Sequence, residues 1–485
     1  MRKVHLVTFR QKDHKGNKAK LEKHVQKHAA KMAAKGLSKR VKIKHELKNL
    51  PRVFVIEDAD DELLEDLKND PNVLSVEEDG QDKICMAQSP AEWSHTYMDV
   101  SQFHSRGYTG KGVKVGYIDT GCAPHEDLVY AGTYSAYNTN IPAAADARGH
   151  GTKVAGIIGM RNNDKGYVGV APDCLLYGVK ADENNPNSGT IYISAQIAGV
   201  DWLVSQGVKI INCSFSGSTD MLSRRIAYED AYLNHGVLFV CSAGNTGDST
   251  DIDPNDPNEK RYPAAYDFVI AVGCVSTGGR IASYSTRASY VDVSAYGDRV
   301  MSTAPSAANV AGTDYTTPST LYESFNGTSC AAPHVAGLAA LYWQMYPSYT
   351  ADQIRDLIES NVLDYGVLGQ DITYGKGMVI SPWTSKTVDR ATLSSYGPGY
   401  GTLQERKPFI FKYVAPKTGQ YTFNPRGQSS TPRIDVYDSI GRRLTGTKYS
   451  PPVTVTLTEG QTYYIGLYGS THTVSGPFSL NVTTP

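Results

Sequence analysis

The chain has 485 residues, which is too long for one hydrophobic core of ordinary size, so two or three domains are expected. Hydrophobic residues make up 40% of the chain, charged residues 20%, and the net charge is −1, a composition typical of a globular protein. No apolar run approaches the roughly 18 residues that a membrane-spanning helix needs, which excludes a membrane span.

Residues 1–86 are charged and rich in lysine. Two strand-like runs flank a helical stretch of Lys, His and Ala, and a second helix and a last strand follow. The strands are expected at 4–10, 52–57 and 73–77, and the second helix at 60–69. The 17 Lys and Arg against 3 Asp and Glu in the first 52 residues are typical of a solvated helix face. No aromatic interleaving or binding motif supports a nucleic-acid surface.

Apolar strands and amphipathic helices alternate through residues 87–382. Helices are expected at 151–159, 194–206 and 223–235, between buried strands that read KGVKVGYID, CLLYGVKA, VKIINCSF, GVLFVCSAGN and FVIAVGCV. This order predicts an α/β fold in which right-handed βαβ units build a parallel sheet with helices on both faces.

The pattern changes again towards the C-terminus. Residues 383–404 are rich in small residues and are expected to form a linker. Residues 405–485 contain short strands separated by turn residues, such as GQYTFNP, RIDVYDS and QTYYIGLYG. These strands predict a small antiparallel β-sandwich.

Three motifs of the 87–382 region supply an acid, a base and a nucleophile. VGYIDTG puts Asp119 at the end of a strand, RGHGTKVAG puts His150 at the start of a helix, and NGTSCAAPHVAG puts Ser329 at the start of another. Each motif alone also fits a cap or a turn. Together they provide what acyl transfer by a serine needs: a hydroxyl nucleophile, an imidazole that accepts and returns its proton, and a carboxylate that orients the imidazole.

A fourth motif, FVCSAGNTG, ends a strand at Asn245. The Asn245 amide and the Ser329 backbone N–H are expected to donate to an oxygen on which negative charge develops, whereas the alternative is a simple turn asparagine. Ser329 also gains from the positive end of its helix. Pro333 is assigned to the first turn of that helix, where a missing N–H has no helical partner to lose.

The four motifs, in the order Asp, His and Ser, resemble the subtilisin family, and CSFSG, RYPAAYDFVIAVGCV and YGKGMV extend the resemblance over nearly all of residues 1–382. It implies a monomeric serine endopeptidase of broad specificity that cuts proteins and peptides through an acyl-enzyme. It also implies that the substrate lies as an added strand between two walls. The wall residues are Ser214, Phe215, Ser216 and Gly217 on one side, and Ala243, Gly244 and Asn245 on the other.

Both flanking regions also resemble known domains. Residues 1–86 resemble the family's prodomain, an intramolecular chaperone and inhibitor whose tail crosses the active site. Ala87 and Gln88 match a frequent start of the mature enzyme, so self-cleavage is expected at or near the Met86–Ala87 bond. Residues 405–485 resemble pre-peptidase C-terminal domains, which implies an accessory β-sandwich; a purely structural appendage is the alternative.

The resemblance further implies a structural Ca²⁺ site. Its ligands are the side chains of Gln88, Asp127 and Asn163 and the backbone carbonyls of Arg161, Lys165 and Tyr167. Oxygen ligands on a flexible loop suit calcium. The alternative is a polar turn without a metal.

Four positions depart from the family pattern. Lys153 replaces a second His, from which we expect altered packing, and Cys330 replaces a Met, from which we expect sensitivity to thiol reagents or peroxide. Ser216 replaces a Gly of the wall, and Arg261 falls near the floor of the family's primary specificity pocket. These two residues predict tolerance for polar or acidic side chains before the scissile bond, unless Arg261 extends to solvent.

The compartment and one other class of function stay open. The resemblance favours a secreted protein, whereas free thiols among the seven Cys and the lack of a secretory segment after Met1 favour one kept inside the cell. A catalytically inactive peptidase scaffold that binds ligands is the alternative function, and the complete set of four site residues argues against it. The chain contains no HExxH motif, the pattern typical of zinc peptidases, and no catalytic cofactor is expected.

Overall fold

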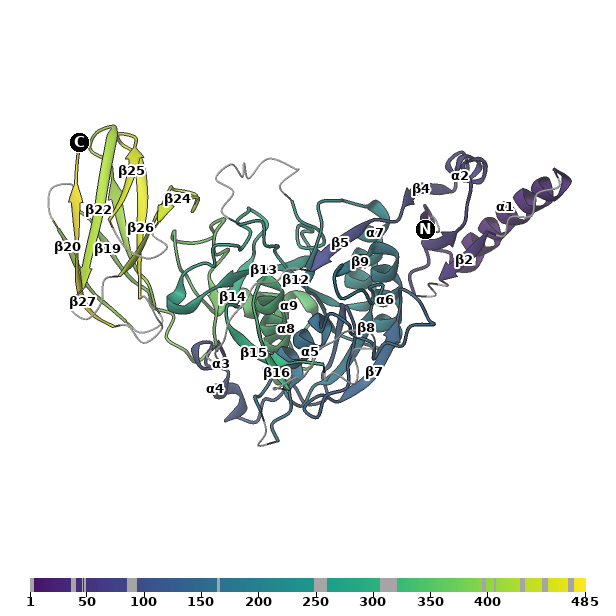
Figure 1. The fold of residues 1–485 in the computed structure, drawn as a ribbon, viewed down its shortest axis with the longest axis horizontal. Helices are drawn as coiled ribbons and strands as arrows, with labels where there is room; N and C mark the ends of the chain where they lie inside the picture. Colours follow the sequence, from purple (N-terminus) through teal and green to yellow (C-terminus); the bar gives the residue numbers. More distant parts are fainter. Residues whose placement is uncertain are drawn as a thin grey trace.

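The computed structural model describes residues 4–35, 41–45, 47, 49–84, 94–163, 166–247, 260–305, 321–394, 398–404, 407–427, 432–446, 452–469 and 475–485. Three regions follow one another along the longest axis of the molecule (Figure 1). A small N-terminal unit and a C-terminal pair of sheets lie on opposite sides of a large central α/β body.

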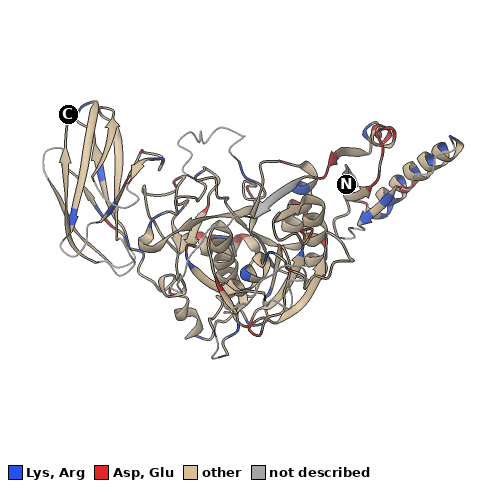
Figure 2. Cartoon of the chain, viewed as in Figure 1, with Lys and Arg blue, Asp and Glu red and all other residues tan. Residues whose placement is uncertain are grey.

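The N-terminal unit is an antiparallel sheet with two helices, α1 (His14–Ala34) and α2 (Asp61–Lys68). Its strands, in spatial order, are β2 (Lys42–His45), β3 (Val53–Glu57), β1 (Val4–Phe9) and β4 (Val73–Glu78). One face of the sheet, with Val7 and Phe54, packs with the two helices, and the other face, with Leu6 and Val55, joins the core of the central body. The lysines predicted on a solvated face lie along α1 (Figure 2).

The central body is built on a nine-stranded sheet. In spatial order its strands are β17 (Val362–Leu363), β18 (Met378–Val379), β14 (Val293–Tyr296), β13 (Val269–Val275), β12 (Leu238–Ser242), β10 (Ile210–Cys213), β6 (Lys114–Asp119), β8 (Leu175–Lys180) and β7 (Tyr130–Ser135). The pairs are parallel except β17 with β18. The predicted parallel sheet is therefore confirmed.

Helices cover both faces of this sheet, as predicted. One face carries α5 (His150–Gly159), α8 (Thr328–Met345) and α9 (Ala351–Ser360), and the other carries α6 (Ile193–Ser205) and α7 (Leu222–His235). Successive strand residues alternate between two cores: Tyr117 packs on the α5/α8 side and Ile118 on the α6/α7 side. Burial on both faces explains why these strands are apolar at nearly every position.

Two sheets that share one hydrophobic core make up the C-terminal region. One sheet contains β19 (Asp389–Thr392), β21 (Phe409–Val414), β26 (Thr462–Tyr468), β23 (Arg433–Tyr437) and β24 (Arg443–Gly446). The other contains β20 (Gly399–Leu403), β27 (Gly476–Thr483), β22 (Gly419–Gly427) and β25 (Val453–Leu457). The range predicted as a linker, 383–404, thus contributes two strands, because Leu393 and Leu403 find buried places in the shared core.

A buried charged contact joins this sandwich to the central body. Arg280, just after β13, donates from Nε and Nη2 to the two carboxylate oxygens of Asp435 on β23, each at 2.6 Å. Asp435 is fully buried and also accepts from Arg443 Nε at 2.8 Å. Tyr374 of the central body meets Tyr468 of the sandwich with their hydroxyls 3.2 Å apart. Paired buried charges fix the relative position of the two regions.

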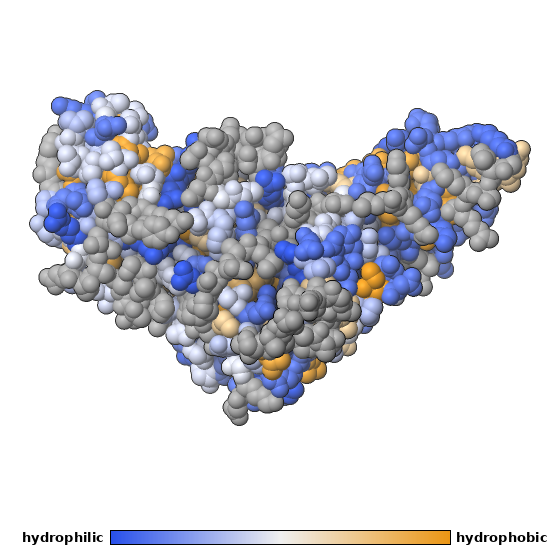
Figure 3. Space-filling view, viewed as in Figure 1, coloured by the Kyte–Doolittle hydropathy of each residue, from blue (hydrophilic) through white to orange (hydrophobic). Residues whose placement is uncertain are grey.

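Within the described ranges, no helix is both long and apolar enough to cross a membrane. The face seen in Figure 3 is mostly hydrophilic, with apolar side chains scattered in small groups. Such scattered groups are ordinary on a protein surface.

Candidate active site

Asp119 and His150 meet where β6 ends and α5 begins. His150 Nδ1 lies 2.6 Å from Asp119 Oδ1, and both side chains are fully buried. The other imidazole nitrogen, Nε2, is buried and has no hydrogen-bond partner among the described residues. A carboxylate on Nδ1 fixes the tautomer of the ring and leaves Nε2 to exchange a proton with a third group.

Asp146, four residues before His150, is hydrogen-bonded to residues next to both Asp119 and His150. It is fully buried. Its carboxylate accepts four hydrogen bonds of 2.6–2.9 Å, from Thr120 Oγ1, Gly149 N, Thr152 N and Thr152 Oγ1. The first donor follows Asp119 directly, and the others flank His150, so one carboxylate holds both sides of the Asp119–His150 contact. Asp146 was not predicted from the sequence, because an acid before a Gly-flanked helix start is typical of an ordinary turn.

Ser329 is the second residue of α8 and is fully buried. Its Oγ donates to the Ser214 carbonyl at 2.8 Å, and Ser214 Oγ donates to the Ser329 carbonyl at 2.9 Å. Pro333 is the sixth residue of α8, so its assignment to the first turn is wrong. A proline there lacks the N–H that would bond the carbonyl four residues earlier, which is that of Ser329. The Ser214 hydroxyl satisfies this carbonyl instead.

Asn245 presents a free donor beside the start of α8. Its Oδ1 accepts from Thr328 N at 3.1 Å and from Thr328 Oγ1 at 2.8 Å. Since a backbone N–H can only donate, the amide oxygen must face Thr328 and the NH₂ group must face away. Nδ2 is buried without a partner among the described residues. An unpaired buried donor next to a helix N-terminus is suited to an anionic oxygen.

A three-stranded sheet runs past these groups. Its middle strand, β5 (Gln81–Ile84), belongs to the N-terminal region and pairs antiparallel with β11 (Phe215–Ser216) on one side and β9 (Thr190–Tyr192) on the other. β11 lies in the predicted wall 214–217. β9 was not predicted, since three residues after a turn-rich stretch give no strand pattern. The second predicted wall, residues 243–245, does not flank β5, whose other neighbour is β9; it adjoins α8, where Gly244 N donates to Thr328 Oγ1 at 3.2 Å.

Three of the six predicted calcium-ligand residues are in contact, two of them through their side chains. Asn163 Nδ2 lies 2.8 Å from Asp127 Oδ1, and the other Asp127 oxygen accepts from the Tyr322 hydroxyl. Arg161 N donates to the Asp127 carbonyl at 3.0 Å, and the Tyr167 ring packs edge-on against Tyr322. Gln88 and Lys165 lie outside the described residues. In the described part of the chain, no group of three or more His, Cys, Asp or Glu could hold a metal ion.

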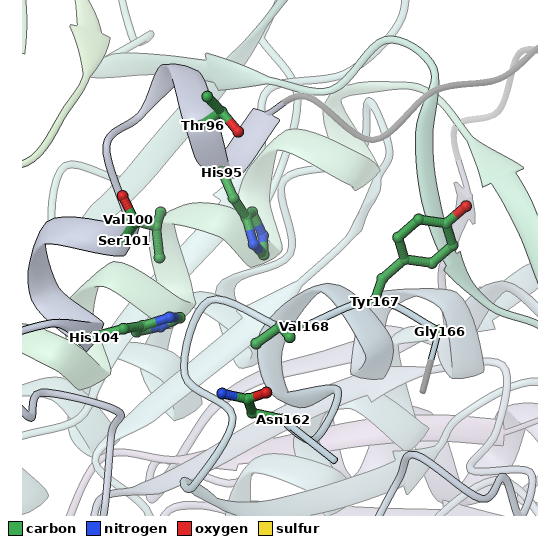
Figure 4. Close-up of a pocket in the computed structure, with 9 residues that line it drawn as sticks. All are labelled: His95, Thr96, Val100, Ser101, His104, Asn162, Gly166, Tyr167 and Val168. Carbon is green, nitrogen blue, oxygen red and sulfur yellow. The ribbon is translucent and has the colours of Figure 1, made fainter. Parts of the chain in front are cut away.

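A cavity of about 300 Å³ lies next to this segment. Figure 4 shows His95 and His104, from α3 (Ser94–Tyr97) and α4 (Ser101–His104), on one side and Asn162, Gly166, Tyr167 and Val168 on the other. Burial and the neighbouring His334 and His104 lower the pKa of His95 well below its usual value. Neither Asp119, His150 nor Ser329 lines this cavity, so it is separate from the candidate catalytic residues.

Two departures from the family pattern have structural explanations. Lys153 is nearly buried, and its Nζ lies 2.6 Å from Glu323 Oε2, so an ion pair takes the place of a second His. Cys330 is fully buried, and burial raises its pKa well above the usual value. A buried neutral thiol reacts slowly, which argues against the expected sensitivity to thiol reagents.

Comparison with known proteins points to one family. The model of the subtilase family matches residues 110–377. The thermostable alkaline protease of Halalkalibacterium halodurans is 37% identical over 339 residues, which cover 70% of this chain and 84% of that protein. Subtilisin E of Bacillus subtilis is 36% identical over 321 residues, 66% of this chain and 77% of that protein. Minor extracellular protease Epr of Bacillus subtilis is 33% identical over 353 residues, and the match spans half of its length.

Proposed function

This chain belongs to the subtilase family and is a serine endopeptidase, and on that premise we propose that Asp119, His150 and Ser329 are its catalytic triad. One observation carries the proposal: a buried Asp119–His150 hydrogen bond of 2.6 Å leaves His150 Nε2 without a partner among the residues that the structure describes. An unpaired buried nitrogen is costly unless it serves a ligand or a reaction.

The first chemical step needs one rotation. The Ser329 hydroxyl is bonded to the Ser214 carbonyl and not to His150. In the proposed step, Ser329 turns about χ1 so that its Oγ gives its proton to His150 Nε2 as it attacks the carbonyl carbon of the substrate. Asn245 Nδ2 and the Ser329 N–H donate to the resulting oxyanion. The imidazolium, stabilised by Asp119, then protonates the leaving amine, and water hydrolyses the acyl-enzyme by the same route in reverse.

The strand position of β5 supports a mode of substrate binding. A peptide that takes this place adds a strand between β11 and β9 and is held by backbone hydrogen bonds. Backbone bonds do not read side chains, so a broad range of protein and peptide substrates is expected.

Residues 1–86 are proposed to be an inhibitory prodomain, and two acidic contacts support this. Glu77 accepts from Leu222 N and Ser223 N, each at 2.9 Å, at the start of α7. Asp79 accepts from Ser194 N at 2.7 Å and from the Ser194 hydroxyl, at the start of α6. Carboxylates at helix N-termini are favourable, so these contacts hold β5 in the substrate position. The proposed cleavage bond, Met86–Ala87, lies outside the described residues.

Labelling of the nucleophile tests the triad. A fluorophosphonate reagent should attach to Ser329 of the mature protein, and peptide mass analysis should locate the label there. The His150→Ala variant, freed of residues 1–86 by an added protease, should label at least about a hundredfold more slowly, because no base removes the Ser329 proton. Labelling at another serine, or equal rates in the two proteins, would contradict the proposed triad.

Asp146 provides a second test of the same geometry. Replacing it with Asn is expected to lower kcat about a hundredfold, because a small displacement of His150 is enough for such a loss. The control is Asp371→Asn, a buried carboxyl outside the site whose pKa is raised by burial to about 8. Equal turnover in Asp146→Asn and parent would show that the four hydrogen bonds do not position the pair.

A structural Ca²⁺ ion is proposed at Asp127 and Asn163. Their side chains fit the ion, because turning the Asn163 amide over puts its oxygen next to Asp127 Oδ1, so that two oxygen donors face one point. When bound, the ion would crosslink Asn163 to Asp127. It takes no part in the steps above.

Thermal melting tests this site without reference to activity. In an inactive Ser329→Ala background, Ca²⁺ at about 100 times its Kd should stabilise the fold by about 2.7 kcal/mol. Asp127→Asn should abolish the increase in Tm, whereas Glu126→Gln, on the exposed neighbouring residue, should keep it. An unchanged Ca²⁺ effect in Asp127→Asn would place the ion elsewhere.

Secretion is also proposed, and the name of one relative, an extracellular protease, supports it.

A further inference from the structure

Arg261 lies beside Gly244. A Cβ atom built on Gly244 would lie 2.9 Å from Thr286 Oγ1 and 3.3 Å from both Arg261 Cγ and Ser216 Oγ. Backbone hydrogen bonds of 3.0 and 2.8 Å between Gly217 and Tyr262 hold the next residues together. The stem of Arg261 and the Ser216 hydroxyl therefore converge on Gly244, a wall position that has no side chain.

The charge of Arg261 is not balanced in the described part of the chain. Its side chain makes no hydrogen bond or ion pair there, and its Nε is buried without a partner. Arg355, another part-buried arginine, has carboxylate partners in Asp292 and Glu359. A guanidinium with a buried and unpaired N–H group gains strongly from a carboxylate, since charge-assisted bonds are the strongest of protein hydrogen bonds.

We propose that Arg261 makes this endopeptidase prefer Glu or Asp immediately before the scissile bond. The inference rests on the proposed function, because Gly244 lies between Ala243 and the oxyanion donor Asn245, in the wall predicted to face that side chain. An acidic side chain entering the space beside Gly244 meets the guanidinium, with the Ser216 hydroxyl on its other side. Backbone pairing still allows substrates of many sequences, and the charge of Arg261 favours those with an acidic residue before the scissile bond.

The proposed self-cleavage bond does not contradict this preference. Met86 precedes that bond and is not acidic. The bond is part of the same chain, however, and an intramolecular reaction has a very high effective concentration. The bond after a weakly preferred residue is then cut once within the chain, whereas separate substrates in solution compete according to their kcat/KM.

The test uses the matured protein and peptides that differ only in the residue before the scissile bond: Glu, Gln, Leu or Lys. The parent should cut the Glu peptide with a kcat/KM about tenfold or more above that of the Gln peptide. Arg261→Gln should remove this difference, and Arg261→Glu should favour Lys. Lys260→Gln, which removes a charge from the exposed neighbouring residue, should keep the parent's ranking. Added salt should reduce the preference, because the site is partly exposed.

Two failures of the test are distinguishable. If the peptides are cut but Glu is not preferred, or Arg261→Gln keeps the preference, Arg261 does not select the substrate. A lack of preference for Glu would be the result if Arg261 paired with the acidic residues of 248–259. If no peptide or unfolded protein is cut by the parent, the proposed function itself fails, and the inference fails with it.

Discussion

Replacing Ser329 with alanine is expected to lower the rate of peptide hydrolysis by about 10⁶-fold, the magnitude established for subtilisin itself. The reason is that alanine cannot form the acyl-enzyme, while the Asp119–His150 pair and the Asn245 donor have nothing to activate or stabilise. The rate should be measured with a chromogenic peptide under conditions in which the parent shows a linear progress curve.

A buried serine outside the site gives the matched control. Ser294 of β14 is fully buried, and its hydroxyl donates to the Tyr374 carbonyl at 3.2 Å. Ser294→Ala should lose about 1 kcal/mol of stability and keep its turnover. A Ser329→Ala protein that still hydrolyses the peptide at a rate near that of the control would rule out Ser329 as the nucleophile.

Asp435→Ala is expected to destabilise the protein by about 3–5 kcal/mol, because it leaves two arginines without their buried partner. Arg280 bonds both Asp435 oxygens and Arg443 bonds one of them. Pairing with Asp435 outweighs burial and raises the pKa of Arg280 above its usual value. Without the carboxylate, burial alone acts on Arg280, so the sandwich should separate from the central body more easily.

Melting and limited proteolysis in the Ser329→Ala background measure this effect without self-digestion. Asp435→Asn keeps the shape of the side chain and some of its hydrogen bonds, so its stability should lie between that of the parent and that of Asp435→Ala. The surface control is Asp267→Ala, which breaks a loose pair with Arg225 at 3.9 Å and should change stability by less than about 0.5 kcal/mol. If Asp435→Ala melts like this control, the contact does not hold the sandwich in place.

Local patterns were enough to predict the centre of the fold. The apolar strands around Tyr117 and Val240 are buried on both faces, so their sequences alone indicate a parallel sheet. Helix α8 was found because Ser329 begins a long apolar run. The strands β9 and β20 were missed, because short strands among turn residues are stabilised by their neighbours and not by their own sequence.

Contacts between distant residues could not be predicted. Sequence spacing gives no reason to join Arg280 to Asp435, or Ser214 to the nucleophile, because only the fold brings them together. The role of Pro333 was misjudged for the same reason. Its missing N–H leaves the Ser329 carbonyl without a helical donor, and the Ser214 hydroxyl, from a distant part of the sequence, donates to that carbonyl. At the predicted calcium site, the contact of Tyr322 with Asp127 likewise joins segments far apart in the chain.

The most direct test of the proposed self-processing protease is the intact mass of the full chain over time, in the presence of Ca²⁺, beside the Ser329→Ala variant. The account predicts that the parent loses a fragment ending at or near Met86, while the variant stays whole with β5 in the substrate position. A variant that is cut at the same bond and rate, or a folded parent that never matures, would contradict it.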